Sequence, residues 1–93
     1  MSRFRLQVTG EVQGVGFRWF TREAARRLGL AGWVRNNADG SVEILVEGSD
    51  GPLERFVAAV RRGPEGAAVS QVRRAPETAG EALPTPFEIQ GRR

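Results

Sequence analysis

The stretch FRLQVTGEVQGVGFRWFTREAARRL, residues 4–28, changes its pattern twice. Apolar and polar residues alternate over residues 4–8, which predicts a strand with one buried face. Residues 10–16 then hold three glycines in seven positions, a composition that favours a tight loop. From residue 17 onward apolar residues recur at helical spacing, and the pattern predicts a helix over residues 17–28 with a buried stripe of Phe20, Ala24 and Leu28.

After this helix, the sequence predicts a β-hairpin. Gly29 stands where a glycine commonly ends a helix. Residues 31–36 and 41–47 have the composition of two strands, and residues 37–40 between them, NADG, form a turn. The polar segment 48–52 then supplies turn residues, a capping side chain and a proline for the first turn of a second helix, which ends near Arg62.

The last third of the chain predicts strands at residues 68–74 and 87–90, separated by a polar excursion at residues 76–86. The resulting order, βαββαβ, matches the ferredoxin-like α+β sandwich, with two helices on one face of an antiparallel sheet and a short fifth strand. We expect residues 1–93 to form one domain, because a chain of this length buries only roughly 60 to 65 % of its unfolded surface in a single core.

The composition excludes several kinds of chemistry. The chain has no cysteine and no histidine, so it can form no disulfide, thiolate site or Ser-His-Asp triad. All 14 basic residues are arginines, and without lysine there is neither a Schiff base nor a P-loop signature. The longest strictly apolar run, residues 56–60, is far too short to span a membrane. We therefore expect a cytoplasmic monomer that needs no cofactor and binds neither membrane nor nucleic acid.

The glycine-rich loop is the strongest local signal for a binding site. Successive N–H groups in such a loop can converge on one point, and the first turn of the following helix adds unpaired donors and the positive end of its dipole. Arg18 lies in that first turn, where a cation is unfavourable unless an anion neutralises it. The alternative is that the glycines only permit a tight connection and that Arg18 is solvated.

Asn36 and Asn37 are the only asparagines of the chain. Asparagine at the end of a strand most often serves the turn that follows. In the expected topology, however, the strands at residues 4–8 and 31–36 flank the same helix, so the carboxyl end of one strand and its partner's edge can come together. The sequence leaves both interpretations open.

Other prominent side chains have ordinary structural explanations. We expect most of the aromatic residues around the first helix and second strand to be core, and Glu23 to pair with Arg27. Arginines at helix ends complement the helix dipole, and those in the fourth strand and the tail are expected to be solvated. The acidic residues lie in turns or on the solvent face of a strand, with no metal-ligand spacing. These groups are Phe17, Trp19, Phe20 and Trp33; Arg26, Arg27, Arg61, Arg62, Arg73, Arg74, Arg92 and Arg93; and Asp39, Glu43, Glu47, Asp50 and Glu54.

Three segments, GEVQGVGFR at residues 10–18, GLAGWVRN at 29–36 and DGSV at 39–42, resemble the acylphosphatase family. The resemblance covers most of the chain from residue 4 to 66, and the strand at 87–89 is similar to the family's last one. It implies the ferredoxin-like fold and hydrolysis of acyl phosphates without metal and without a phosphoenzyme. It further implies that Arg18 grips the phosphate oxygens and that Asn36 positions the attacking water, while Asn37 has no implied role. The phosphate would lie on backbone N–H groups of Gln13, Gly14, Val15, Gly16, Phe17 and Arg18.

These residue types suit an activated small-molecule substrate. Phosphoryl transfer can be catalysed mostly by positioning and by charge, with arginine as a bidentate clamp. No general acid is evident, so the site can release a carboxylate but not an alkoxide, and a phosphate monoester should be a poor substrate. Two alternatives remain: a non-catalytic anion-binding or regulatory domain, and an RNA-binding module with the same element order. The strand at residues 41–47 carries no aromatic residue for stacking on bases, which counts against RNA.

Overall fold

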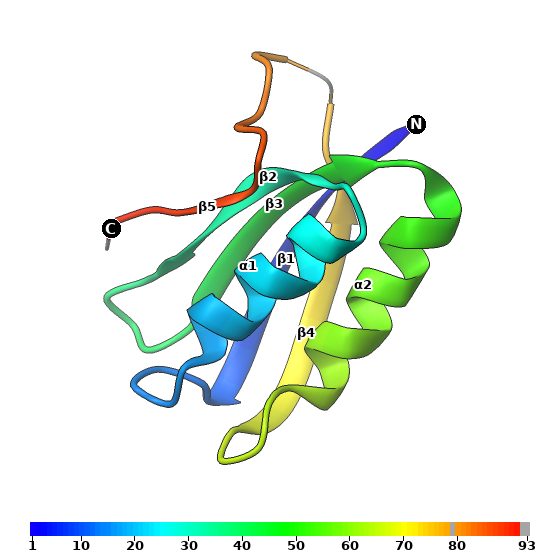
Figure 1. The fold of residues 1–93 in the computed structure, drawn as a ribbon. Helices are drawn as coiled ribbons and strands as arrows, with labels where there is room; N and C mark the ends of the chain where they lie inside the picture. Colours follow the sequence, from blue (N-terminus) through cyan, green and yellow to red (C-terminus); the bar gives the residue numbers. More distant parts are fainter. Residues whose placement is uncertain (79, 92–93) are drawn as a thin grey trace.

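The computed structural model describes residues 1–78 and 80–91. Two helices cover one face of a five-stranded sheet of order β4-β1-β3-β2-β5 (Figure 1). This confirms the predicted ferredoxin-like α+β sandwich, and no helix in the described ranges is long and apolar enough to cross a membrane. The elements are β1 (Ser2–Glu11), α1 (Phe17–Arg27), β2 (Ala31–Asn36), β3 (Val42–Gly48), α2 (Asp50–Arg62), β4 (Ala68–Pro76) and β5 (Glu88–Ile89).

Strand β3 sets the geometry of the sheet. It pairs antiparallel with β1 on one side and with β2 on the other. Val42 at its start lies opposite Val8 of β1 and Asn36 of β2. Because both neighbours run against β3, they run parallel to each other and their carboxyl ends lie at the same edge. The loop that follows β1 and the last residue of β2 therefore share one end of the molecule.

The fifth strand is shorter than predicted and runs parallel to its neighbour β2, so the sheet is mixed rather than wholly antiparallel. At the outer edge of the sheet, β5 lies beside β2 and runs in the same direction as that strand. Phe87 anchors it: its side chain is fully buried, its ring centroid lies 6.1 Å from that of Phe56, and its carbonyl accepts a hydrogen bond from Arg26 Nε at 2.8 Å.

The buried stripe of α1 differs from the predicted one. The buried residues of α1 are Phe17, Thr21, Ala24 and Ala25, so that only Ala24 of the predicted stripe is fully buried. Of the four aromatic residues around the first helix and second strand, most of which were expected to be core, Phe17 and Trp33 are buried, Phe20 is half-buried and Trp19 is 59 % exposed. The helix begins at residue 17, as predicted, so the difference lies in which face packs on the sheet: the fully buried Phe17 and Thr21 lie on the buried face in place of Phe20. The rest of the core is apolar: Leu6, Val8, Val34, Ile44, Val46, Leu53, Phe56 and Val60 are all fully buried.

Two expected local contacts are absent from the structure. Ser49 precedes α2 but its side chain makes no capping hydrogen bond. Glu23 pairs with its neighbour Arg22 at 3.1 Å rather than with Arg27. For Glu23 the neighbouring Arg22 offers an equivalent partner, and exposed ion pairs of this kind contribute little to stability.

The arginines of β4 are not both free. Arg74 pairs with Glu54 of α2 through two hydrogen bonds, at 3.0 and 2.6 Å, and its guanidinium lies 4.1 Å from the centroid of the Phe4 ring. Arg73 is exposed, as expected. Arg92 and Arg93 lie outside the described residues.

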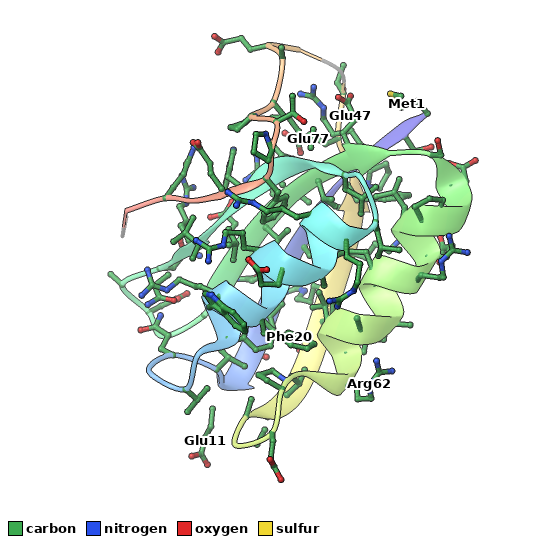
Figure 2. All side chains as sticks on the ribbon, in the orientation of Figure 1. Met1, Glu11, Phe20, Glu47, Arg62 and Glu77 are labelled. Atoms are coloured by element: carbon green, nitrogen blue, oxygen red, sulfur yellow. The ribbon has the colours of Figure 1, made fainter. Side chains whose placement is uncertain are left out.

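The face of the sheet away from the helices carries an ion-pair network. Glu43, expected to be solvated, is half-buried and accepts hydrogen bonds from Arg5 and from Arg35, the latter at 2.9 Å. Arg5 also bonds Glu77, at 3.1 and 3.2 Å. Arg35 lies over the ring of Trp33, 4.5 Å from its centroid. Figure 2 shows Glu47 and Glu77 at the end of the molecule opposite Glu11, so part of this charged face lies far from the glycine-rich loop.

This network makes folding stability depend on pH. Burial alone raises the pKa of Glu43, but hydrogen bonds and charge from Arg35 and Arg5 outweigh it and hold the pKa below its ordinary value of 4.5. The unfolded chain therefore takes up the proton first as pH falls. The stabilisation is complete above about pH 4.5 and is lost as pH falls through the folded-state pKa.

We expect Glu43→Gln to lower the free energy of unfolding at pH 7 by about 1–3 kcal/mol, because it leaves two arginines short of a partner. Its stability should also change less than that of the wild type between pH 5 and pH 3. Urea unfolding followed by circular dichroism measures both. Glu54→Gln is the matched control, because that pair is more exposed and should matter less. Equal pH dependence in wild type and Glu43→Gln would contradict the assignment.

Candidate active site

The loop between β1 and α1 is shaped by two glycines in the left-handed region. Gly14 and Gly16 have φ of +77° and +78°, and a Cβ built on either would meet nothing within 4 Å. The requirement for glycine here is therefore conformational rather than steric. No oxygen of the described residues accepts a hydrogen bond from the N–H groups of residues 14–19. The loop thus offers a series of free donors.

The start of α1 adds to this site. Gly16 is its N-cap and supplies no side-chain oxygen, and the first turn holds no acidic residue. Arg18 is half-buried in that turn and has no hydrogen-bond or ion-pair partner within residues 1–78 and 80–91. Free N–H groups, the helix dipole and an unpaired guanidinium all favour an anion.

These groups surround a hollow of about 170 Å³. Of the site residues expected from the sequence, Gly14, Gly16, Phe17 and Arg18 line the hollow, whereas Gln13 and Val15 do not. Three apolar residues that the sequence did not single out for a site complete the lining. The full lining is Val12, Gly14, Gly16, Phe17, Arg18, Trp19 and Ile89. Ile89 could not be assigned from the sequence, because its place depends on the parallel pairing of β5 with β2.

Asn36 is the last residue of β2, at the same end of the sheet as the loop. Its Oδ1 is buried and accepts no hydrogen bond from any described residue. Asn36 is not among the residues that line the hollow. Ile89, which does line it, pairs with Val34, and Val34 lies two positions before Asn36 on the same face of β2. The structure thus places an unsatisfied acceptor at the same end of the sheet as the loop's free donors.

Gln13 has a role that sequence reasoning missed. Its side-chain Nε2 donates to the carbonyls of Asn37 and Ser41, at 2.8 and 2.9 Å, and so ties the loop to the turn between β2 and β3. Ser41 is buried, and its Oγ donates to Asp39 at 2.7 Å. The hydrogen bonds from the side chain and the backbone of Ser41 hold the pKa of Asp39 below its ordinary value. The only signal in the sequence was the DGS turn, which does not indicate that the side chain of Gln13 would bind its carbonyls.

Within the described ranges, no three acidic, cysteine or histidine side chains group together in a way that could hold a metal ion. The lining of the hollow contains no carboxylate. Its donors are N–H groups, which repel cations.

Known proteins resemble this chain over nearly all of its length. The family model for acylphosphatase matches residues 4–89. An acylphosphatase of Rhizobium etli is 48 % identical over 87 residues, 94 % of this chain and 92 % of that protein. One of Salinibacter ruber is 53 % identical over 82 residues, covering 88 % of this chain and 86 % of that protein.

A solved structure agrees with the sequence matches. The crystal structure of acylphosphatase from Bacillus subtilis has a TM-score of 0.91 with this chain at 41 % identity, covering 97 % of this chain and 99 % of that one. The fold, the sequence and the length of this chain therefore all agree with those of known acylphosphatases. The chain belongs to the acylphosphatase family of enzymes, which hydrolyse acyl phosphates.

Proposed function

We propose that this enzyme hydrolyses acyl phosphates by direct attack of water on phosphorus, without metal and without a phosphoenzyme. The observation that carries the proposal is the series of unpaired N–H groups and the unpaired Arg18 guanidinium around one hollow. A phosphate there would neutralise the misplaced cation and satisfy the donors. The N–H groups assigned to it are those of Gln13, Gly14, Val15, Gly16, Phe17 and Arg18.

Asn36 would orient the nucleophile. Its Oδ1 is a buried acceptor that lacks a donor, and a water O–H can supply one. The water oxygen forms the new bond to phosphorus as the bond to the acyl oxygen breaks. The carboxylate leaves with the electron pair, and the proton of the water ends on the phosphate product. The leaving carboxylate is a weak base, so no general acid is needed.

The lining of the hollow also supports a mechanism without metal. The transition state carries its charge on the phosphoryl oxygens, where backbone donors and a bidentate guanidinium can stabilise it. A cation placed among these donors would be repelled, and no lining carboxylate would hold it.

The open face of the sheet supports a small-molecule substrate rather than RNA. Trp33 is only 9 % exposed and Arg35 covers its ring, so no base can stack on it. We also propose that the enzyme acts as a monomer.

We expect Arg18→Gln to lower kcat for acetyl phosphate by on the order of 10³-fold or more, by analogy with arginines that stabilise phosphoryl-transfer transition states. Inhibition by inorganic phosphate should weaken as well. Hydrolysis is measured in EDTA. Arg27→Gln is the matched control, since Arg27 lies exposed in the last turn of the same helix. Loss of wild-type activity on metal removal would overturn the metal-free mechanism, and an active Arg18→Gln enzyme would overturn the assigned clamp.

We expect Asn36→Ala to lower kcat far more than it weakens inhibition by inorganic phosphate. The reason is that this change removes orientation of the water and leaves the contacts to bound phosphate in place. Steady-state kinetics with phosphate as competitive inhibitor give both numbers, and a urea midpoint shows that the variant is folded. Equal losses in kcat and in phosphate affinity would refute the role.

A further inference from the structure

Trp19 is exposed beside the hollow. Among the described residues only Met1 and Trp19 are large apolar side chains with most of their surface in water, and Met1 is the first residue of the chain. Indole is among the largest apolar groups of a protein, and leaving it in water forgoes a substantial gain from burial. The position immediately after Arg18 places this exposed ring in the first turn of α1.

Trp19 lines the same hollow as the phosphate-binding groups. Ile89 of β5, half-buried, lies in that lining too, and Val12 contributes a third apolar side chain. In an acyl phosphate the acyl carbon is only two bonds from phosphorus. A substrate held by its phosphate on the loop must therefore place its acyl group within or beside this hollow, which has apolar residues to meet it.

We propose that Trp19, with Ile89, binds the acyl group and gives the enzyme a preference for aromatic and long aliphatic acyl phosphates over acetyl phosphate. An aromatic acyl group would pack against the indole ring and cover it from water. Acetyl offers a single methyl group to the same surface. This proposal rests on the proposed function, because it requires the phosphate to be held by the loop and Arg18.

The test compares kcat/KM for benzoyl phosphate and acetyl phosphate in wild type, Trp19→Ala, Trp19→Phe and Trp33→Phe. The two substrates differ in intrinsic reactivity, but that difference cancels when their ratio is compared between enzymes. We expect the benzoyl to acetyl ratio to fall about tenfold in Trp19→Ala, the size of one good aromatic contact. Trp19→Phe should keep most of the preference. Trp33→Phe, which changes the tryptophan on the opposite face, should keep the wild-type ratio.

An unchanged ratio in Trp19→Ala would overturn this proposal, as would an equal fall in Trp33→Phe. Sedimentation showing that Trp19→Ala only dissociates a dimer, with both substrates equally affected, would overturn it too and assign the ring to a subunit contact. None of these results bears on the loop and Arg18. The proposed function fails separately, if Arg18→Gln still hydrolyses acetyl phosphate.

A second inference comes from the hydrogen bonds of Gln13. Its amide spans from the loop to two carbonyls of the turn between β2 and β3, those of Asn37 and Ser41. The turn is itself closed by a hydrogen bond of 2.8 Å from Asn37 N to Ser41 O. Asn37 directly follows Asn36, so the side chain of Gln13 joins the phosphate loop to the backbone beside the assigned water-positioning residue.

We infer that the Gln13 side chain is a positioning residue that fixes the separation between bound phosphate and Asn36. Its two N–H bonds are used in the fold, so the side chain does not need to contact substrate; only its backbone N–H is assigned to phosphate. Loss of the amide would let the loop and the turn move apart. An error of about 1 Å in such a separation can cost on the order of 10²-fold in rate.

The test is a double-mutant cycle of Gln13→Leu and Asn36→Ala, with kcat and phosphate inhibition measured at each corner. We expect Gln13→Leu to lower kcat about tenfold or more and to weaken phosphate inhibition less, because the loop's own donors remain. In the Asn36→Ala background the same change should have little further effect on kcat. Gln7→Leu is the matched control, since Gln7 donates to the hydroxyl of Ser41 at 3.4 Å without touching the loop.

Additive losses in the cycle would overturn the inference, because Gln13 would then act independently of Asn36. So would a loss of phosphate affinity as large as the loss of kcat, which would mean that the side chain only shapes the loop. A loss of kcat in Gln7→Leu as large as that in Gln13→Leu would also overturn the inference, because it would show that any loosening of the turn lowers activity. A purely structural role would shift the urea midpoint without separating kcat from phosphate affinity.

Discussion

Strand β3 pairs antiparallel with two strands at once, and the site depends on this pairing. The two neighbours run parallel, so the loop after β1 and the end of β2 lie at one edge of the sheet. The apolar residues that hold β3 in place, Val42, Ile44 and Val46, are fully buried. A shift of one residue in this register would turn all of them toward solvent, so core packing fixes the position of Asn36 relative to the loop.

Among the described residues, polar groups are largely paired on the open face of the sheet and unpaired at the loop between β1 and α1. On the open face of the sheet, Arg5 and Arg35 both pair with Glu43, and Arg35 also covers Trp33, although the buried Nε of Arg35 has no hydrogen-bond partner among the described residues. At the loop, backbone donors, the Arg18 guanidinium and Asn36 Oδ1 have no partner among the described residues. Unsatisfied groups of this kind destabilise a fold, and a loop with several free donors beside an unpaired guanidinium is the expected mark of a site whose missing partner is a ligand.

The fold and the loop were predicted correctly because each rests on local patterns. Alternation marked β1 and β3, and the spacing of glycines marked the loop, since a left-handed backbone favours glycine whatever surrounds it. Local reasoning was less successful for the first helix, where Phe20 of the predicted buried stripe is only half-buried and Trp19 is the exception to the expectation that most of the aromatic residues are core. Helical spacing shows which residues share a face, but the choice of the face that packs on the sheet depends on how the whole helix docks against the strands.

The sequence by itself determined the order of elements, the glycine-rich loop between the first strand and the first helix, and the absence of thiol, imidazole and lysine chemistry, because these depend on residue types and short-range spacing. Tertiary structure alone decided that β5 runs parallel to β2 and brings Ile89 to the hollow, that Gln13 reaches the turn at residues 37–41, and that Arg18 has no described partner. The first two of these contacts join residues more than twenty positions apart in the chain. The third depends on the absence of any described acceptor beside the Arg18 guanidinium. Such relations are set by the packing of whole elements, and no local pattern encodes them.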